Sequence, residues 1–102
     1  MRVIISNTAR GEIARQIAYI QARNPDAART QRARISQAVA LLRDTPRLGK
    51  PGRVAGTREL VIAGTPFLLI YALGDNRLEI LHLKHGRQQW PPEEEEEEDE
   101  PQ

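Results

Sequence analysis

Three apolar runs in the second half of the chain lie so close together that they leave little choice of topology. The runs at 57–62 (TRELVI), 67–73 (FLLIYAL) and 78–83 (LEILHL) are rich in aliphatic and β-branched residues, which is typical of strands. Only four residues separate each run from the next, and both connections contain turn-forming residues. Connections this short join antiparallel strands, because a parallel crossover needs a dozen or more residues. The sequence therefore predicts an antiparallel meander.

Two helices are predicted before the meander. In each, the apolar residues recur at helical spacing: Ile13, Ile17 and Ile20 in the first, and Ala28, Ile35, Val39 and Leu42 in the second. The polar segment Ser6-Asn7-Thr8 offers capping side chains for the first helix. Asn24-Pro25-Asp26 offers an N-cap, a proline at the first helical position and an early acid for the second. So short a connection predicts an antiparallel helical hairpin.

The remaining segments complete the predicted fold. Residues 2–6 are short and β-branched, which predicts a first strand, whereas 45–56 holds two prolines and three glycines, which predicts a loop. We therefore predict an α+β fold in the order strand, helix, helix and three strands, with the helical hairpin packed on one face of a curved antiparallel sheet. The other face would lack a covering layer and be available for function. Residues 1–92 have room for one domain only.

The charges divide the chain into two parts. All 15 Lys and Arg lie within residues 1–92 together with only six acids, a net charge of +9, whereas 93–100 are eight consecutive acids. A domain this basic suits an anionic partner, either nucleic acid or an acidic protein segment. We expect the acidic low-complexity tail, 93–102, to be disordered in isolation, because its charges repel and it has no apolar residue to bury. It either only aids solubility or contacts the basic domain electrostatically.

The composition excludes several kinds of site. The chain has no Cys and only two His, so disulfides, thiolate zinc sites and Cys nucleophiles are ruled out, and neither a metal nor a cofactor is expected. No apolar run approaches the roughly 20 residues of a membrane span, and the apolar stretch near the N-terminus is too short for a signal peptide. We expect a cytoplasmic protein without a membrane partner.

Several segments resemble the ParE/RelE family of type II toxin–antitoxin toxins. They are Asn-Pro and Ala-Ala within 24–28, the block 46–73 (PRLGKPGRVAGTRELVIAGTPFLLIYAL) and 78–91 (LEILHLKHGRQQWP), so the resemblance spans nearly all of 2–91. It implies a small bacterial toxin that a co-encoded antitoxin neutralises in a hetero-oligomer. ParE-type members poison DNA gyrase, whereas RelE-type members cut messenger RNA on the ribosome. The phrase GRVAGTRE, at 52–59, resembles the ParE branch more closely.

The two branches imply different roles for the cationic residues. Metal-free RNA cleavage needs a base, an acid and cations around one phosphate, and the resemblance to RelE-type enzymes maps these roles to Arg58, His85 and Arg87. The lysine cluster that precedes the arginine in those enzymes is reduced here, and ParE-type members keep a similar arginine and histidine without known nuclease activity. For a gyrase-binding toxin we expect a target-binding surface made of Lys50, Arg53 and Lys84.

The catalytic candidates also have structural interpretations. His85 is two residues after Leu83, so in a strand both would point to the same face, and His85 would then lie at the edge of the core. The stem of Arg58 would be buried, and its guanidinium would then pair with Glu59 or Glu79, because a buried charge is costly without a partner. A third hypothesis, beside the gyrase poison and the ribonuclease, is a non-toxic interaction protein whose toxicity has decayed or is blocked by its own acidic tail.

Structural roles are expected for several other residues. Trp90, which precedes two prolines, is expected to close the core rather than to stack on a base. Tyr71, in the middle of a strand, is expected to be structural. The arginines of the second helix are expected to form a solvated face: Arg29, Arg32, Arg34 and Arg43.

Overall fold

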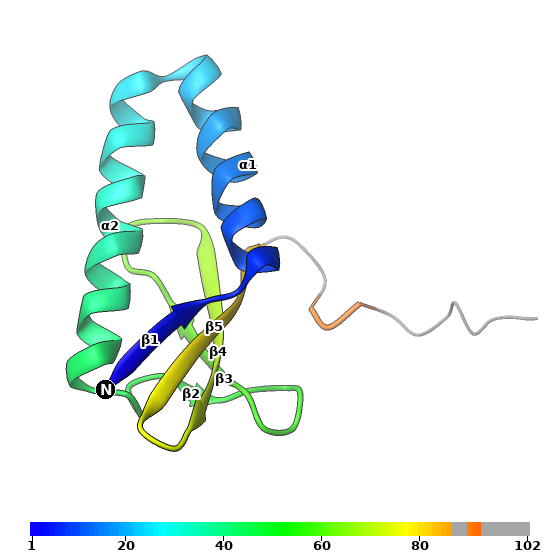
Figure 1. Cartoon of the computed structure of the whole chain (residues 1–102). Coiled ribbons are helices and arrows are strands. Elements are labelled where there is room, and N and C mark those ends of the chain that lie inside the picture. The colour runs from blue at the N-terminus through cyan, green and yellow to red at the C-terminus, as the bar shows by residue number, and fades with distance from the viewer. Residues whose placement is uncertain (87–89, 93–102) are drawn as a thin grey trace, which may run out of the picture.

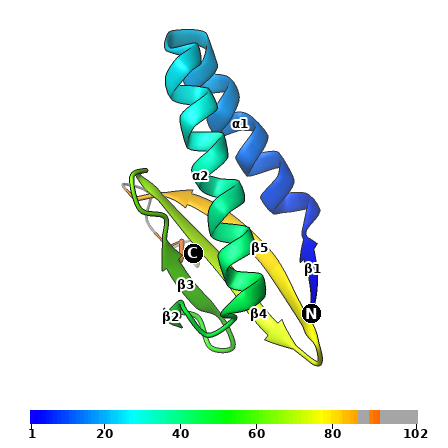
Figure 2. The ribbon, with the colours of Figure 1, turned by 90° about the vertical axis from the view of Figure 1, so that its left-hand side faces the viewer.

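A five-stranded sheet with a helical hairpin against one face makes up the fold (Figure 1). The structure, a computed structural model, describes residues 1–86 and 90–92. In chain order the elements are β1 (Arg2–Ile5), α1 (Asn7–Arg23), α2 (Pro25–Asp44), β2 (Lys50–Pro51), β3 (Arg58–Val61), β4 (Phe67–Gly74) and β5 (Arg77–His85). Figures 1 and 2 show that the turn between α1 and α2 projects beyond the sheet. The predicted α+β fold is confirmed.

The sheet is mixed, with the strand order β1-β5-β4-β3-β2. Strands β3, β4 and β5 pair antiparallel, as predicted, and β2 also pairs antiparallel with β3. The prediction of an antiparallel sheet was wrong for β1, which runs parallel to β5 with Arg2 opposite Arg77 and Ile5 opposite Ile80. A short turn fixes the relative direction of two strands, but no short turn joins β1 to β5. The segment 45–56, predicted as a loop, also contains the two-residue strand β2.

Both helices begin where the capping residues predict. The Ser6 hydroxyl oxygen accepts a hydrogen bond from the Ala9 N–H at 3.0 Å. Asn24 serves both helices, because its N–H donates to the Ile20 carbonyl oxygen at 2.7 Å and its side chain accepts from the Ala27 N–H at 3.1 Å. One residue therefore ends α1 and begins α2, which sets the tight turn of the hairpin.

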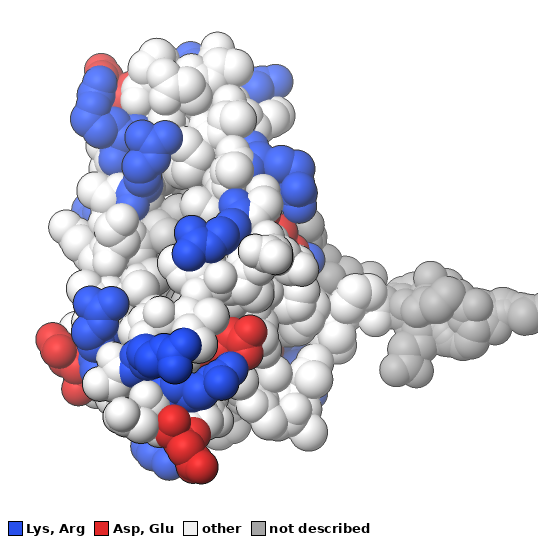
Figure 3. Space-filling view, viewed as in Figure 1, with Lys and Arg blue, Asp and Glu red and all other residues white. Residues whose placement is uncertain are grey.

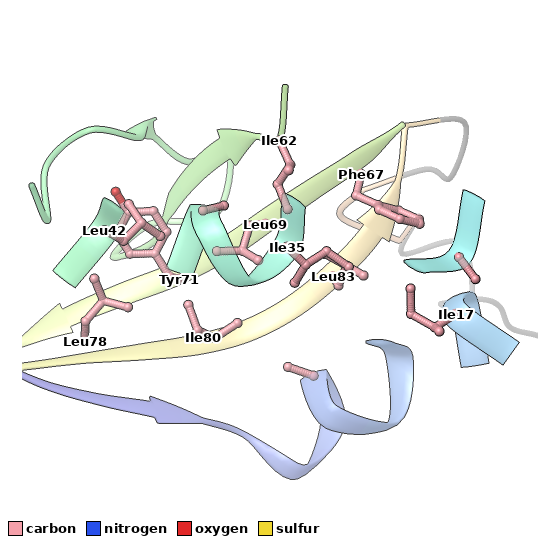
Figure 4. Close-up of a cluster of buried hydrophobic side chains, with 13 residues drawn as sticks. Ile17, Ile35, Leu42, Ile62, Phe67, Leu69, Tyr71, Leu78, Ile80 and Leu83 are labelled. Atoms are coloured by element: carbon pink, nitrogen blue, oxygen red, sulfur yellow. The ribbon is translucent and has the colours of Figure 1, made fainter. Parts of the chain in front are cut away.

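The core lies between the helical hairpin and the sheet (Figure 4). Its largest fully buried side chains on this side of the sheet are Phe67, Leu69 and Tyr71 of β4, Leu78, Ile80 and Leu83 of β5, and Leu42 of α2. Ile17 of α1 and Ile35 of α2 pack against them. Every residue of the apolar stripes predicted from the sequence, except Val39, lies in this core or packs against it.

A register shift decides which residues of β5 face the helices. Ile70 lies opposite His82, but the next residue, Tyr71, lies opposite Ile80, so Leu81 is an extra residue in β5. The bulge allows Ile80 and Leu83, three positions apart, to enter the same core. We call the face turned away from the helices the open face. By cross-strand register it carries Lys50, Glu59, Val61, Leu68, Ile70, Ala72, Glu79, His82 and Lys84.

Candidate functional site

Arg58, the first catalytic candidate, holds the loop that precedes β3. Its Nε and Nη2 donate to the Gly49 carbonyl oxygen at 2.9 and 2.6 Å, and Nη2 also donates to that of Arg47 at 3.2 Å. Neither Glu59 nor Glu79, the two carboxylates considered as its partners, pairs with it, since both bind other arginines. The carbonyl oxygens of a turning loop lack strand partners and accept from this guanidinium instead.

Tyr71 fixes the same loop from the sheet. Its hydroxyl accepts from the Gly49 N–H at 2.9 Å and donates to the Pro46 carbonyl oxygen at 2.7 Å. Gly49 has no room for a side chain, because a Cβ there would lie 2.7 Å from the Tyr71 hydroxyl oxygen and 2.8 Å from the Glu59 carbonyl oxygen. Tyr71 is fully buried, so its expected structural role is confirmed.

Glu59 holds Arg53 on the open face. Glu59 is only 2% exposed, and it accepts from the N–H of Arg53 at 3.0 Å and from its Nη2 at 3.0 Å. Burial by itself raises the pKa of this carboxyl. The hydrogen bonds and the charge of Arg53, with a smaller effect from Lys50, lower the pKa by more than burial raises it. The net pKa lies below the ordinary value of 4.5. The Arg53 side chain remains 55% exposed.

Glu12 closes the edge of β5 where β1 no longer covers it. Pairing with β1 ends at Ile80, and α1 then brings Glu12 against the strand. Its carboxylate accepts from the Leu83 N–H at 3.0 Å and from Lys84 Nζ at 2.7 Å, and His82 Nδ1 lies 3.3 Å away. Sequence reasoning missed this residue. The available signal was that Glu12 is the only acid in α1 and directly precedes the apolar stripe.

The same contacts set the charge of Glu12. Burial alone raises the pKa of the carboxyl. Hydrogen bonds from Lys84, the Leu83 N–H and His82, together with the charge of Lys84, lower the pKa by more than burial raises it. The net pKa lies below 4.5. Glu12 is therefore ionised at neutral pH, and Lys84 is held at the edge of the sheet with only 18% of its side chain exposed.

Trp90 covers one corner of the open face. Its ring centroid lies 4.7 Å from that of His82, and Lys84 Nζ lies 5.6 Å from the Trp90 centroid. The expectation that Trp90 closes the core was wrong about the face, because His82 and Lys84 point away from the helices. In Figure 1 the segment 90–92, drawn in orange, lies on the side of the sheet opposite α2.

His85, the second catalytic candidate, lies far from Arg58. Its ring packs edge-on against Phe67 on the helix side, with centroids 6.2 Å apart, a position at the edge of the core. Arg58 lies opposite Tyr71, and His85 lies opposite Phe67, four residues away along β4. With ordinary strand dimensions, the Cα atoms of Arg58 and His85 are about 16 Å apart. Arg87 lies outside the described residues.

The three residues expected to bind a target all lie on the open face. Lys50 and Lys84, the only lysines of the chain, belong to it by register, and Arg53 reaches it through Glu59. The structure therefore separates these cations from Arg58 and His85, whose positions in the register face the helices.

A groove of about 460 Å³ lies between α1, α2 and β1. Apolar side chains and three arginines line it: Ile5, Arg10, Ile13, Ala14, Arg32, Ile35, Ser36, Val39, Ala40 and Arg43. Arg32 and Arg43 line the groove but, like Arg29 and Arg34, are exposed, so the expected solvated arginine face of α2 is confirmed. Arg29 pairs with Asp26 on the surface. On the side of the molecule shown in Figure 3, Lys and Arg cover more surface than Asp and Glu.

Two other kinds of site are absent from the described part of the chain. No group of three or more His, Asp or Glu side chains there could hold a metal ion. No helix within residues 1–86 and 90–92 is long and apolar enough to cross a membrane.

Comparisons with known proteins place this fold in a toxin class. Residues 3–90 match the family described as ParE toxin of type II toxin-antitoxin system, parDE. A Sinorhizobium fredii (strain NBRC 101917 / NGR234) protein named "Putative toxin Y4kP" is 46% identical over 74 residues, which are 72% of this chain and 76% of that protein. The chain belongs to the ParE toxin family of type II toxin–antitoxin systems.

Solved structures show the same fold at low sequence identity. A chain from the chromosomal ParDE toxin–antitoxin system of P. aeruginosa superimposes with a TM-score of 0.75 at 19% identity, covering 83% of this chain and 95% of that one. A chain of the YoeB dimer from Staphylococcus aureus superimposes with a TM-score of 0.52 at 15% identity and the same coverage. The ParE family implies a cognate antitoxin as partner.

Proposed function

We propose that the chain arrests bacterial growth in the cytoplasm by binding DNA gyrase, and that its antitoxin prevents this. The observation that carries the choice of gyrase over messenger RNA is the separation of Arg58 from His85 by about 16 Å. A base and an acid that cleave one phosphodiester must both come within hydrogen-bond reach of it. Arg58 is, moreover, occupied by carbonyl oxygens of its own loop. A surface for protein contact fits this geometry better than a nuclease site.

The experiment compares the two targets with the same purified chain. We expect it to block supercoiling by gyrase or to trap cleaved DNA, and to leave ribosome-bound messenger RNA intact. His85→Ala is expected to keep the effect on gyrase, since His85 lies at the helix-side core edge. Messenger RNA cuts that disappear in both Arg58→Ala and His85→Ala would instead establish the ribonuclease. Unimpaired growth when the chain is produced without antitoxin would favour the non-toxic interaction protein.

We further propose that an acidic amphipathic segment of the antitoxin occupies the groove between α1, α2 and β1. The groove combines apolar residues such as Ile13 and Val39 with Arg10, Arg32 and Arg43, none of which forms an ion pair with another described residue. An amphipathic segment would bury the apolar floor and neutralise the arginines together.

Two neighbouring positions on α2 offer a matched test of this docking. Ser36 lines the groove, whereas Gln37 lines the surface toward β3. Ser36→Glu places a like charge in the path of an acidic segment and competes with it for the groove arginines. It is expected to weaken antitoxin binding roughly tenfold or more, about 1.4 kcal/mol, because a like-charge contact in an interface is costly. Gln37→Glu should leave the dissociation constant almost unchanged. Equal effects of the two substitutions would exclude the groove as the docking site.

A further inference from the structure

The last residues that the structure describes, 90–92, begin on the open face with Trp90, so the acidic tail starts from this side of the sheet. Trp90 packs on His82 and lies near Lys84, both on that face. Pro91 and Pro92 follow, exposed. Eight acids, 93–100, come directly after them in the sequence. We propose that this acidic tail lies across the open face of its own domain and covers Lys50 and Arg53, a contact that goes beyond the proposed function.

The charges of the open face fit an acidic segment. Lys50 is exposed at the sheet edge, and the Arg53 side chain is 55% exposed although Glu59 holds one side of it. The carboxylates of Glu12 and Glu59 are buried against cations of their own, so they present little charge to an approaching tail. Exposed charges of opposite sign attract over about 10 Å at 0.1 M salt.

The tail is long enough to reach these cations. His82, Ile70, Glu59 and Lys50 are consecutive partners across β5, β4, β3 and β2. Three strand spacings separate the first from the last, about 14 Å. Ten residues can extend to about 33 Å. Because the tail is tethered at Trp90, its local concentration at the face is about millimolar, so even weak ion pairs would be populated.

The groove between α1, α2 and β1 also carries arginines, but it is a poorer destination. It lies on the helix side of the sheet, whereas Trp90 starts the tail from the opposite side. To enter the groove, the tail would have to pass around the edge of β5, where α1 and Glu12 are packed. The open face requires no such detour.

The contact would regulate access to the face that carries Lys50, Arg53 and Lys84. Any partner that uses these cations must first displace the tail. Neutralising the tail would then strengthen binding of an acidic probe, and salt would reduce the difference, since exposed pairs are screened.

The two lysines allow a direct test in the full chain. A carbodiimide joins a carboxylate to a neighbouring amine with loss of water, and only Lys50, Lys84 and the N-terminus supply amines. At low salt we expect monomeric products in which residues 93–100 are joined to Lys50, detected by mass spectrometry and lost at 0.5 M salt. The Lys84–Glu12 pair, at 2.7 Å, is the internal positive control.

The controls distinguish this contact from its alternatives. Tail products joined equally to the Met1 amine and Lys50 would indicate unspecific contact, and products found only between two chains would indicate a neighbouring copy. Replacement of all eight acids of 93–100 by the corresponding amides, Gln or Asn, should abolish the Lys50 product of this segment but keep the Lys84–Glu12 product. Absence of any Lys50–tail product at low salt, with the positive control present, would overturn the proposal.

A second measurement separates the open face from the groove. Because the chain has no cysteine, Gln102→Cys creates a single site for a nitroxide spin label and keeps every acid of the tail. We expect the label to broaden the amide signals of Lys50, Glu59 and Val61 at low salt and to leave those of Arg32 and Ser36 sharp. The opposite pattern would place the tail in the groove and contradict the proposal.

Discussion

At the scale of single residues, Glu12 links helix, strand and charge. Glu12→Gln keeps an acceptor for the Leu83 N–H but leaves the partly buried Lys84 ammonium without its counter-charge. Hydrogen bonds to charged groups contribute about 1.5–3 kcal/mol, so we expect the free energy of unfolding at pH 7 to fall by about 2 kcal/mol. Urea denaturation of the two proteins measures the difference.

The pH dependence follows from the lowered pKa values of Glu12 and Glu59. A carboxyl whose pKa is lower in the folded protein contributes stability that is complete above pH 4.5 and is lost as the pH falls through the folded value. The free energy of unfolding should therefore fall below pH 4.5, less steeply in Glu12→Gln. Asp26→Asn is the control, since that side chain is 91% exposed. Identical acid slopes in Glu12→Gln and the unmodified chain would contradict this role.

Tyr71 gives a third prediction at this scale. Tyr71→Phe keeps the ring in the core but removes the hydroxyl that joins Gly49 to Pro46. The buried Gly49 N–H then lacks an acceptor, which costs about 1–3 kcal/mol. Thermal or urea unfolding should detect this loss, whereas Tyr19→Phe, at an exposed position, should change stability by less than about 0.5 kcal/mol. Equal stability of Tyr71→Phe and the unmodified chain would mean that the loop is held by Arg58 alone.

At the scale of secondary-structure elements, the stability of the helical hairpin depends on Asn24, which caps both helices. Asn24→Ala keeps the N–H that ends α1 but loses the side-chain acceptor that begins α2. Loss of such an N-cap costs about 1 kcal/mol. The exposed Gln21→Ala, inside α1, should cost nothing, because Ala is the better helix former. Helix content and denaturation midpoints of the two variants test the difference, and a loss in Gln21→Ala as large as that in Asn24→Ala would argue against the cap.

The elements also show what local sequence patterns can and cannot predict. Periodicity and capping residues predicted both helices and the meander, because these depend on neighbours in the sequence. The direction of β1 depends on a strand more than 70 residues away, and the bulge at Leu81 depends on packing across β4. For the same reason the sequence did not reveal that Glu12 meets Lys84, or that Arg58 and His85 lie at distant positions.

At the scale of the whole molecule, local stability is expected to differ between the sheet and the tip of the helical hairpin. The middle of β4 and β5 is buried on both faces at Ile70, Tyr71 and Ile80, whereas the tip of the helical hairpin projects beyond the sheet (Figures 1 and 2). Amides of these three residues should exchange hydrogen only through global unfolding, while those near Asn24 exchange through local opening. Hydrogen exchange followed by NMR measures both. Slower exchange at the hairpin tip than in β4 would contradict this order.

The way in which the sheet ends has a consequence for self-association. An unpaired strand edge is a template for further strands. At one edge, β2 has only two residues, and Pro51 has no N–H to donate. At the other edge, where β5 extends beyond β1, the Glu12 carboxylate accepts from the Leu83 N–H and so keeps that N–H from pairing with another strand. The missing N–H of Pro51 is a property of the proline ring and does not change with pH, whereas the protection by Glu12 depends on the charge of its carboxylate. Acid therefore weakens the edge at β5 first, and strand-to-strand aggregation at low pH would begin there.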